Sequence, residues 1–365
     1  MRILLLEPFY TGSHKQWAEG LRAYSRHEIE ILGLAGQHWK WRMQGSAPIL
    51  TDAMHGKERP DLLLYSDMAH LPACQALLPE GWHDIPTALY MHENQITYPW
   101  SSGDKDLRHE RNSSYGMINV LSCLTADHIF FNSEFHRRSF LDALPNFLDR
   151  FPDYQLTDKV LEIADKSQVL SVGISPPGIK EKVPVIATDS PIVLWNHRWA
   201  FDKNPKDFFN VLFRLDERNI PFRLVVLGDH DLHCDEIFDR ARDQLNHRIL
   251  HWGFLEDKND YYLWLWTCDV YPVTAIQDFF GISVVEAIAH GNFPLLPDRL
   301  AYPEHIPAAL KEMHLYRGLR SLEEKLSQYL LHPKPISHQL IEQVEVYYWT
   351  RIIDQYDTAF ESCRN

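Results

Sequence analysis

Four residues in the second half of the chain could carry out the chemistry of a sugar nucleotide. Arg198 and Lys203 are cations five positions apart, and Asp278 and Glu286 are carboxylates separated by seven residues. Negative charge grows on a diphosphate when its glycosidic bond breaks, so a nearby guanidinium and ammonium stabilise the transition state more than the ground state. We therefore predict catalytic roles for Arg198, Lys203 and Asp278, with Asp278 directed to sugar hydroxyls. Glu286 is predicted to reach a ribose diol.

A glycine and a short apolar run lie between the two carboxylates. Gly281 precedes Ile282–Ile288, whose composition predicts a helix. Glycine lets the backbone approach a ligand closely. The unpaired N–H groups at the start of a helix, together with its dipole, favour a phosphate. We therefore predict that Gly281, Ile282 and Ser283 bind the donor.

Arg198 and Asp278 each follow a run of residues that is typical of a buried strand. Ile192–Trp195 precedes Arg198, and Asp269–Thr274 precedes Asp278. Open α/β sheets bind ligands at the carboxyl ends of parallel strands. This ordered combination resembles the acidic pair and the Arg/Lys pair of family-4 retaining glycosyltransferases, which have the GT-B fold.

Strand-like and helix-like segments alternate along the chain, which predicts βαβ units and mostly parallel sheets. The expected strands are Ile3–Leu6, Glu28–Leu34, Asp61–Tyr65, Thr87–Met91, Asp127–Phe131, Gln168–Val172, Ile192–Trp195, Arg223–Leu227, Ile249–Trp252, Asp269–Val273 and Phe293–Leu296. The expected helices include Lys15–Tyr24, Tyr115–Thr125, Glu134–Ala143, Lys206–Glu217, Asp235–Leu245, Tyr261–Trp266, Ser283–Ala289, Leu322–Leu331 and a long tract near Gln339–Glu361.

This pattern predicts an α/β protein of the GT-B type, with two Rossmann-like, doubly wound domains facing an inter-domain cleft. A polar linker rich in proline and glycine, Gly173–Pro184, separates the two alternations. We expect an N-terminal acceptor-side domain in residues 1–178 and a sugar-nucleotide-binding domain in residues 179–338. Residues 339–365 are expected to form a helical tract that packs back on the N-terminal domain.

The composition narrows the class of protein. A chain of 365 residues with 45% hydrophobic and 24% charged residues is typical of a soluble globular protein of two domains. No apolar run approaches the ~18 residues of a membrane span, so we expect no membrane partner. The run Met1–Leu6 is too short for a signal peptide. The net charge is −14 and both halves are acidic, which gives no support to a nucleic-acid partner.

The cysteines and histidines do not predict a metal centre. The five cysteines are scattered and never form a CxxC pair, a pattern typical of reduced thiols in a cytoplasm. The 20 histidines include no HExxH motif. We therefore expect a cytoplasmic protein with no cofactor and no metal.

The loop after the first expected strand contains Gly12, Ser13 and His14. A dinucleotide-binding fingerprint needs three glycines at this point, so the single glycine argues against a nicotinamide cofactor. We expect Ser13 to cap the following helix. A loop of this kind can hold a phosphate or an acceptor, although any strand–turn–helix connection needs a glycine.

Two tryptophans alternate with two cations in the segment Trp39-Lys40-Trp41-Arg42. They could stack on a base or a sugar while the cations reach a phosphate. Alternatively, the tryptophans pack beneath a loop and the charges face water. The sequence leaves both interpretations open.

Polar residues follow the expected strand Thr87–Met91 directly. His92, Glu93, Asn94 and Gln95 come in succession where packing requires none of them. A histidine at the carboxyl end of a strand can form a hydrogen bond with a donor sugar, so we predict that His92 is catalytic. The three residues after it are predicted to bind the acceptor. Asn132, at the end of another strand, is predicted to do the same.

Several motifs together resemble a narrower group, the tRNA-queuosine α-mannosyltransferases. The motifs are Gly12–Gln16, Trp39–Arg42, His92–Gln95 with Tyr98-Pro99, Asn132–Phe135, His197–Trp199 with Asp202-Lys203, Leu250–Leu255 and Tyr302–Glu304. The resemblance implies GDP-mannose as the donor and queuosine, in an aspartate tRNA anticodon, as the acceptor. It also implies retention of configuration without a metal. The residues Gly12, Ser13, His14, Trp39, Lys40, Trp41 and Arg42 would then contact the acceptor.

The chain departs from the family pattern in two places. Asp278 stands where the family usually has glutamate, and a long insertion between the halves of animal members is absent. The loops near Gly228–Asp231 and at Phe254-Leu255 are expected to contact the donor base. The sequence alone does not distinguish GDP from UDP or mannose from another hexose.

Two other functions remain open at this point. One is a family-4 glycosyltransferase with a lipid, a glycan or a small-molecule acceptor. The other is a non-catalytic nucleotide- or RNA-binding protein, which the intact set Arg198, Lys203, Asp278 and Glu286 argues against. A small basic patch around Lys40, Arg42, Arg108 and Arg111 could serve an anticodon loop. We expect Arg198→Ala and Lys203→Ala to abolish transfer with little effect on folding.

Overall fold

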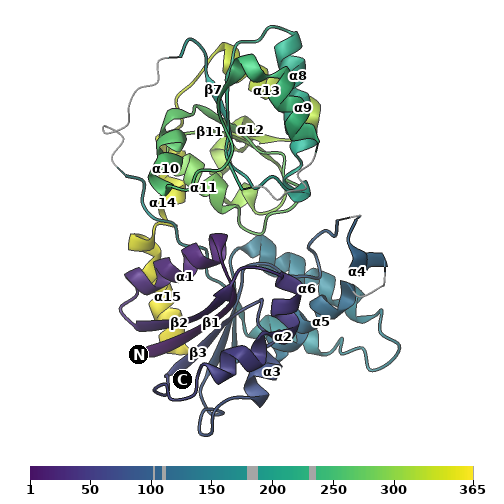
Figure 1. Cartoon of the computed structure of the whole chain (residues 1–365), viewed down its shortest axis with the longest axis vertical. Coiled ribbons are helices and arrows are strands. Elements are labelled where there is room, and N and C mark those ends of the chain that lie inside the picture. Colours follow the sequence, from purple (N-terminus) through teal and green to yellow (C-terminus); the bar gives the residue numbers. More distant parts are fainter. Residues whose placement is uncertain (102, 109–111, 179–187, 230–235, 365) are drawn as a thin grey trace. The chain divides into compact units, whose positions relative to one another are not determined.

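The computed structural model describes residues 1–101, 103–108, 112–178, 188–229 and 236–364, with the side chains of residues 108 and 112 left out. The chain forms two compact units. Unit 1 comprises Met1–Ser175 and Tyr347–Asn365, and unit 2 comprises Pro176–Val346. Figure 1 shows a sheet flanked by helices in each of them.

Unit 1 is built on a six-stranded parallel sheet in the order β2-β1-β3-β4-β5-β6. Its strands are β1 (Arg2–Tyr10), β2 (Glu28–Ala35), β3 (Leu62–Ser66), β4 (Thr87–Met91), β5 (His128–Phe131) and β6 (Ser167–Val169). Every residue of β3 and β4 is buried. Such continuous burial is expected of central parallel strands, which helices cover on both faces.

The helices of unit 1 cover this sheet. They are α1 (Gly12–Tyr24), α2 (Trp39–Asp52), α3 (Leu71–Ala76), α4 (Lys105–Arg108), α5 (Asn112–Thr125), α6 (Glu134–Leu148), α7 (Lys159–Asp165) and α15 (Trp349–Ser362). The last of them comes from the far end of the sequence and lies beside α1 (Figure 1). Tyr356 of α15 accepts a hydrogen bond from Trp17 at 3.0 Å and donates to the Ser171 carbonyl at 2.8 Å.

Unit 2 has a second six-stranded parallel sheet, in the order β12-β11-β10-β7-β8-β9. Its strands are β7 (Ile192–Trp195), β8 (Arg223–Val226), β9 (Ile249–Trp252), β10 (Val270–Pro272), β11 (Phe293–Pro297) and β12 (Leu315–Tyr316). Its helices are α8 (Pro205–Glu217), α9 (Ile237–Gln244), α10 (Lys258–Thr267), α11 (Ile282–Ala289), α12 (Lys311–His314), α13 (Leu319–Leu331) and α14 (His338–Glu345).

The expected strands at Thr87–Met91, Ile192–Trp195 and Ile249–Trp252 have the expected bounds. The elements that were not expected include helix α2, which contains Pro48, and β12, which is only two residues long. The expected tract Gln339–Glu361 is divided into α14, which contacts α11 in unit 2, and α15, which packs in unit 1.

The described part of the chain contains no helix long and apolar enough to cross a membrane. The four cysteines that it includes, Cys74, Cys123, Cys268 and Cys363, are free and buried. Burial raises the pKa of the Cys123 thiol and its three counterparts. The fifth, Cys234, lies outside the described residues.

Candidate active site

The sheet of each unit reverses its direction of winding at one pair of neighbouring strands. The pair is β1 and β3 in unit 1, and β7 and β10 in unit 2. The loops that leave the carboxyl ends of such a pair run apart, and open α/β sheets bind ligands there. Most site residues predicted from the sequence follow these strands or the next strand along the sheet.

Lys203 is the centre of a charge cluster in unit 2. Its Nζ lies 2.9 Å from Asp278 Oδ1 and 3.1 Å from Asp202 Oδ2, and it donates to the Gln277 carbonyl at 3.0 Å. Burial opposes the ammonium charge, but the two carboxylates outweigh it and raise the pKa of Lys203. Lys203 and Asp278, both predicted to be catalytic, are therefore in direct contact.

Both oxygens of the Asp278 carboxylate are engaged. Oδ1 pairs with Lys203, and Oδ2 accepts a hydrogen bond from the Tyr302 hydroxyl at 2.6 Å. Burial alone would raise the pKa of Asp278, but the Lys203 charge lowers it. The carboxylate is thus ionised and fixed in orientation at the end of the loop before α11.

Arg198 differs from Lys203 in its exposure. The Arg198 side chain is 65% exposed, and its Nη2 lies 3.9 Å from Asp202 Oδ2. Lys203 is buried, and its removal would leave the buried Asp202 carboxylate without its nearest cation. The expectation of little effect on folding is therefore kept for Arg198→Ala, whereas for Lys203→Ala we now expect a loss of stability, because breaking a buried ion pair is costly.

Gly281 occupies the N-cap of α11 in a left-handed conformation with φ of +84°. A Cβ atom there would lie 3.0 Å from Cε1 of Tyr302, the residue that holds Asp278. A side chain would thus be strained and would press on this contact. Because Tyr302 also holds Asp278, the backbone at Gly281 and at Ile282, the first residue of α11, lies beside the charge cluster.

His197, directly after β7, fixes the first turn of α11. Its Nε2 lies 2.8 Å from the Tyr271 hydroxyl, and its Nδ1 lies 3.2 Å from Ser283 Oγ. Burial, followed by the Lys203 charge, lowers the pKa of His197 to about 4. The imidazole is therefore neutral and serves as a hydrogen-bonding strut rather than as a cation.

Glu286 belongs to a chain of hydrogen bonds inside unit 2. The Tyr261 hydroxyl donates to Glu286 Oε2 at 3.1 Å and accepts from Asn196 Nδ2 at 3.1 Å. Glu286 is only 6% exposed. Its carboxylate is therefore held in place just over one turn inside α11.

The loops predicted to contact the donor base follow β8 and β9. Gly228 has φ of +108°, and a Cβ atom there would lie 1.9 Å from the His197 carbonyl oxygen. Only glycine allows this close approach of two backbones. Phe254 is exposed and Leu255 is half-buried. The loop Gly228–Asp231 is described only as far as Asp229.

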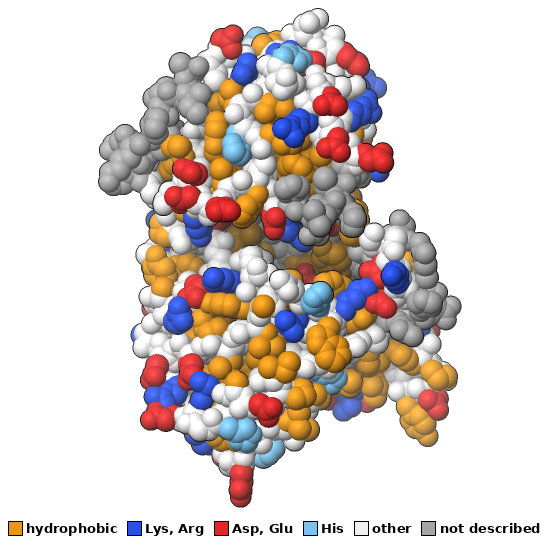
Figure 2. All heavy atoms as spheres, viewed as in Figure 1, with side chains coloured by type: hydrophobic (Ala, Val, Ile, Leu, Met, Phe, Trp, Pro, Cys, Tyr) orange, Lys and Arg blue, Asp and Glu red, His pale blue; other side chains and the backbone are white. Residues whose placement is uncertain are grey.

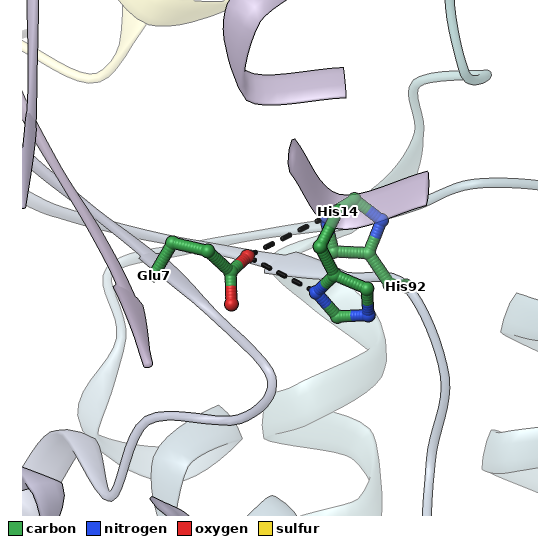
Figure 3. A group of neighbouring side chains, drawn as sticks. All are labelled: Glu7, His14 and His92. Atoms are coloured by element: carbon green, nitrogen blue, oxygen red, sulfur yellow. Dashed lines mark hydrogen bonds and ion pairs between the residues drawn. The ribbon is translucent and has the colours of Figure 1, made fainter. Parts of the chain in front are cut away.

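In unit 1, a buried group of two histidines and a carboxylate lies near the strand pair β1 and β3. His14 Nδ1 lies 3.1 Å from Glu7 Oε2, and His92 Nε2 lies 4.0 Å from the same oxygen. Figure 3 shows one nitrogen of each imidazole turned toward the carboxylate. The two rings pack together with centroids 4.1 Å apart.

The protonation of this group is set by its surroundings. Burial opposes the charge on His14, but Glu7 raises the pKa of its imidazole to about 9. Burial, followed by the His14 charge, lowers the pKa of His92 well below its usual value. His14 is therefore charged and His92 neutral at pH 7. Burial raises the pKa of the neighbouring Asp67 carboxyl.

The four polar residues after β4 have different surroundings. Asn94 is buried, and its Oδ1 accepts hydrogen bonds from the backbone N–H groups of Ile96 and Thr97. Gln95 donates from Nε2 to Glu93 Oε1 at 2.8 Å. The expectation that packing requires none of these residues is wrong for Asn94, which builds the turn.

Asn132 supports the same loop from the neighbouring strand. Its Nδ2 donates to the His92 carbonyl at 2.8 Å, and its Oδ1 lies 2.9 Å from His136 Nδ1. Ser133 caps α6 by accepting from the His136 backbone at 2.9 Å. The structure therefore links Asn132 to His92.

The segment Trp39–Arg42 forms the first turn of α2. Trp39 packs with the rings of Trp100 and Tyr115, whereas Trp41 is 59% exposed. Lys40 pairs with two carboxylates, Asp104 at 2.5 Å and Asp106 at 2.6 Å. Arg42 donates from Nε to the Ala35 carbonyl.

The two interpretations of this segment therefore apply to different residues. Trp39 packs, and Trp41 is available for stacking. In the expected basic patch, the charge of Lys40 is balanced by the carboxylates of Asp104 and Asp106. The Arg108 side chain and Arg111 lie outside the described residues.

Helix α1 begins three residues earlier than the expected start at Lys15. Thr11 is its N-cap and Gly12, with φ of +51°, is its first residue. The expectation that Ser13 caps the helix is therefore wrong. Gly12 and Ser13 are exposed, and His14 turns inward to Glu7.

Comparison with known proteins decides the family. Residues 2–174 match the model of the tRNA-queuosine alpha-mannosyltransferase N-terminal domain, and residues 179–344 match that of the glycosyl transferases group 1. The chain is 32% identical over 346 residues to the tRNA-queuosine alpha-mannosyltransferase of Drosophila melanogaster, covering 92% of this chain and 89% of the relative. The chain belongs to the tRNA-queuosine α-mannosyltransferase family. It is a glycosyltransferase.

Solved structures show that this family member has the GT-B fold. Sucrose-phosphate synthase from Thermosynechococcus elongatus matches with a TM-score of 0.72 and 14% identity, over 99% of this chain and 98% of that one. Anabaena HepE in complex with UDP and glucose matches with a TM-score of 0.64 and 14% identity, over 99% and 100% of the two chains.

Sequence reasoning missed several residues that hold the candidate site residues of each unit of this transferase in place. Glu7 lies inside an apolar strand, and Asp67 follows β3 without a recognisable motif. Tyr261 lies in the helical run of α10, where aromatic residues normally indicate packing. A buried acid in a central strand is the one signal that could have identified Glu7.

Side chains of the types that bind metals meet at one place in the described part of the chain. The ligand-type atoms of Glu7, His14 and His92 all lie within 4.8 Å of one another. Two of these atoms already share the hydrogen bond between Glu7 and His14. That the family member works without a metal remains a prediction.

Proposed function

We propose that this enzyme transfers mannose from GDP-mannose to the queuosine nucleoside of tRNA, in the anticodon of an aspartate tRNA. The observation that carries the proposal is the family match, with 32% identity to a relative of that name over 92% of this chain. We infer that the transfer retains the anomeric configuration and needs no metal. Since the acceptor is a tRNA, we assign the reaction to the cytoplasm.

Unit 2 is proposed to bind the donor. The diphosphate would be held by Arg198, Lys203 and the backbone at Gly281, where the N-terminus of α11 favours negative charge. Glu286 would accept hydrogen bonds from the ribose hydroxyls. Its fixed carboxylate, held by Tyr261, supports this assignment. Gly228, Phe254 and Leu255 would contact the base.

The transfer is proposed to take place on one face of the sugar. The bond between the anomeric carbon and the phosphate oxygen breaks, and the acceptor oxygen forms its bond to the same face. The acceptor hydroxyl loses its proton to the departing phosphate oxygen, so no nucleophile from the protein is required. Arg198 and Lys203 stabilise the charge on the diphosphate. Asp278 and His92 are assigned to the hydroxyls of the hexose.

A tRNA acceptor would have to bind to an acidic protein. The net charge is −14, and Lys and Arg are interspersed with Asp and Glu over the visible face of each unit (Figure 2). An anticodon loop presents few phosphates, so a modest and salt-sensitive affinity is expected. Recognition would then come from the modified base, for which the exposed Trp41 offers a stacking surface.

A donor and acceptor panel tests the proposal. The protein is incubated with tRNA that carries queuosine, or with the same tRNA lacking it, and with GDP-mannose, UDP-glucose or UDP-galactose. We expect a hexose-sized mass gain on the queuosine nucleoside with GDP-mannose alone. A gain on tRNA without queuosine, or transfer from a UDP-sugar in preference to GDP-mannose, would contradict the proposal.

A further inference from the structure

The His92 imidazole is held in place from several sides. Its ring lies 4.1 Å from that of His14, 4.7 Å from Trp17 and 4.8 Å from Tyr90, measured between centroids. Its backbone N–H donates to Asp67 Oδ1 at 2.8 Å. With the bond from Asn132 to its carbonyl, both the backbone and the ring of His92 are fixed.

Glu7 is an unusual residue for its position. It lies within β1 directly after the buried run Ile3–Leu6 and is fully buried. Its Oε1 accepts from the Phe9 backbone at 2.9 Å, and its Oε2 contacts His14 Nδ1 at 3.1 Å. A buried ion pair contributes less to stability than apolar residues of the same size often would. Glu7 is therefore better explained by function than by packing.

The two nitrogens of His92 have different surroundings. Nε2 is buried, has no hydrogen-bond partner among the described residues and lies 4.0 Å from Glu7 Oε2. A neutral imidazole has one N–H and one acceptor nitrogen, and its partners decide which is which. A carboxylate beside Nε2 favours the proton there. Nδ1 is then left to accept a hydrogen bond.

We propose that Glu7 and His14 are positioning residues that orient His92 and set its tautomer for the donor sugar. Glu7 keeps the proton of His92 on Nε2, and His14, anchored to the same carboxylate, packs against the His92 ring. Nδ1 then accepts a hydrogen bond from a hexose hydroxyl. The inference rests on the proposed function, because it takes His92 to contact the sugar.

A double-mutant cycle tests this positioning role. Glu7→Gln is expected to lower kcat by about 10- to 100-fold, as loss of a supporting partner typically does, with little change in the donor KM. Because Glu7 acts through His92, the double variant Glu7→Gln/His92→Gln should be no slower than His92→Gln alone. Losses that multiply would overturn the proposal, as would wild-type kcat in either single variant.

Asp127→Asn is the matched control. Asp127 is a carboxylate of the same unit that accepts from the backbone and the hydroxyl of Thr87, at the amino end of β4. Its variant should keep the wild-type kcat. If Asp127→Asn loses as much activity as Glu7→Gln, the effect is not specific to the residues around His92 and the positioning role is refuted.

A spectroscopic measurement separates this inference from the proposed function, because it needs no transfer. In protein with ¹⁵N-labelled histidine, the His92 signal, assigned by its loss in His92→Gln, should report a proton on Nε2. Glu7→Gln should shift the His92 signal toward a mixture of tautomers. His14→Gln, as a second variant, should also change this signal. A proton on Nδ1 in the wild type, or a His92 signal that changes when a chelator is added, would overturn the proposal.

Discussion

The two units carry different chemistry at equivalent places of similar sheets. In unit 2 the loops after β7 and β10 bring together cations and an ionised Asp278, with Arg198 largely exposed. In unit 1 the loops around β1, β3 and β4 bury a histidine pair and carboxylates, with one histidine held neutral. Topology therefore fixes where a site can form, and the side chains there set its charge and burial.

Under the proposed function, the difference matches what each part of a sugar nucleotide requires. A diphosphate that gains charge needs cations already positioned beside it, and they stabilise that charge most where water is excluded. A neutral hexose needs hydrogen bonds of fixed direction, which buried and closely packed groups provide. The comparison predicts that variants in unit 2 act mainly through charge and that variants in unit 1 act through geometry and protonation.

Arg198→Ala is expected to have the largest effect on activity. Loss of one donor to a developing charge typically costs about 10²- to 10³-fold in kcat. Because the side chain is 65% exposed, the unfolding midpoint in urea should stay unchanged. Arg214→Ala, at a cation of α8 that pairs with Glu323, is the control and should keep the wild-type rate. A wild-type rate in Arg198→Ala would contradict the prediction that variants in unit 2 act mainly through charge.

Lys203→Ala should lose activity and stability together. Its ammonium compensates two carboxylates, and breaking a buried pair typically costs about 3–5 kcal/mol of unfolding free energy. Urea denaturation of Lys203→Ala, compared with that of the double variant Asp202→Asn/Lys203→Ala, measures this loss of unfolding free energy. The double variant should recover part of the lost stability. Equal stability of wild type and Lys203→Ala would contradict the buried pairing.

The histidine pair predicts a dependence of stability on pH. The pKa of His14 is raised to about 9, so its contribution is fully present below the unfolded value near 6.5 and is lost as the pH rises through about 9. The wild type should therefore lose up to a few kcal/mol more than His14→Gln between pH 6.5 and 9.5, at about 1.4 kcal/mol per pKa unit. Parallel curves for the two proteins would show that His14 is uncharged in the folded state.

The smallest effect is expected at Lys40. Its charge is balanced by Asp104 and Asp106, so Lys40→Gln should change the salt dependence of tRNA binding by less than one released counterion. The paired surface carboxylates also limit the loss of stability to about 1 kcal/mol. Filter binding at several salt concentrations tests this. A slope reduced by a full unit would show that Lys40 contacts a phosphate.

The sequence predicted the strands well because their residues are apolar and β-branched in short runs, as in Ile192–Trp195. It predicted the charged residues of unit 2 because they stand at strand ends in a recognisable order. It did not predict that Lys203 is buried between two carboxylates, since the partner Asp278 comes 75 residues later. Such pairings depend on tertiary contacts that no local pattern encodes.

Unit 1 was harder to predict for the same reason. His92 stood out because a polar run follows its strand, but Glu7 looked like an interruption of an apolar strand. Its meaning becomes visible only when β1 and β4 bring it beside His92. For Lys40 the sequence left open whether the cation reaches a phosphate, and it did not indicate the two acidic partners that lie beside it in the structure.

Transfer to queuosine itself is the most direct test of the account. Wild-type protein and Arg198→Ala are incubated with GDP-mannose and queuosine-containing tRNA, and the digested nucleosides are weighed by mass spectrometry. We expect a hexose-sized gain on queuosine with the wild type and almost none with Arg198→Ala. No gain with the wild type, or an equal gain with both proteins, would contradict the account.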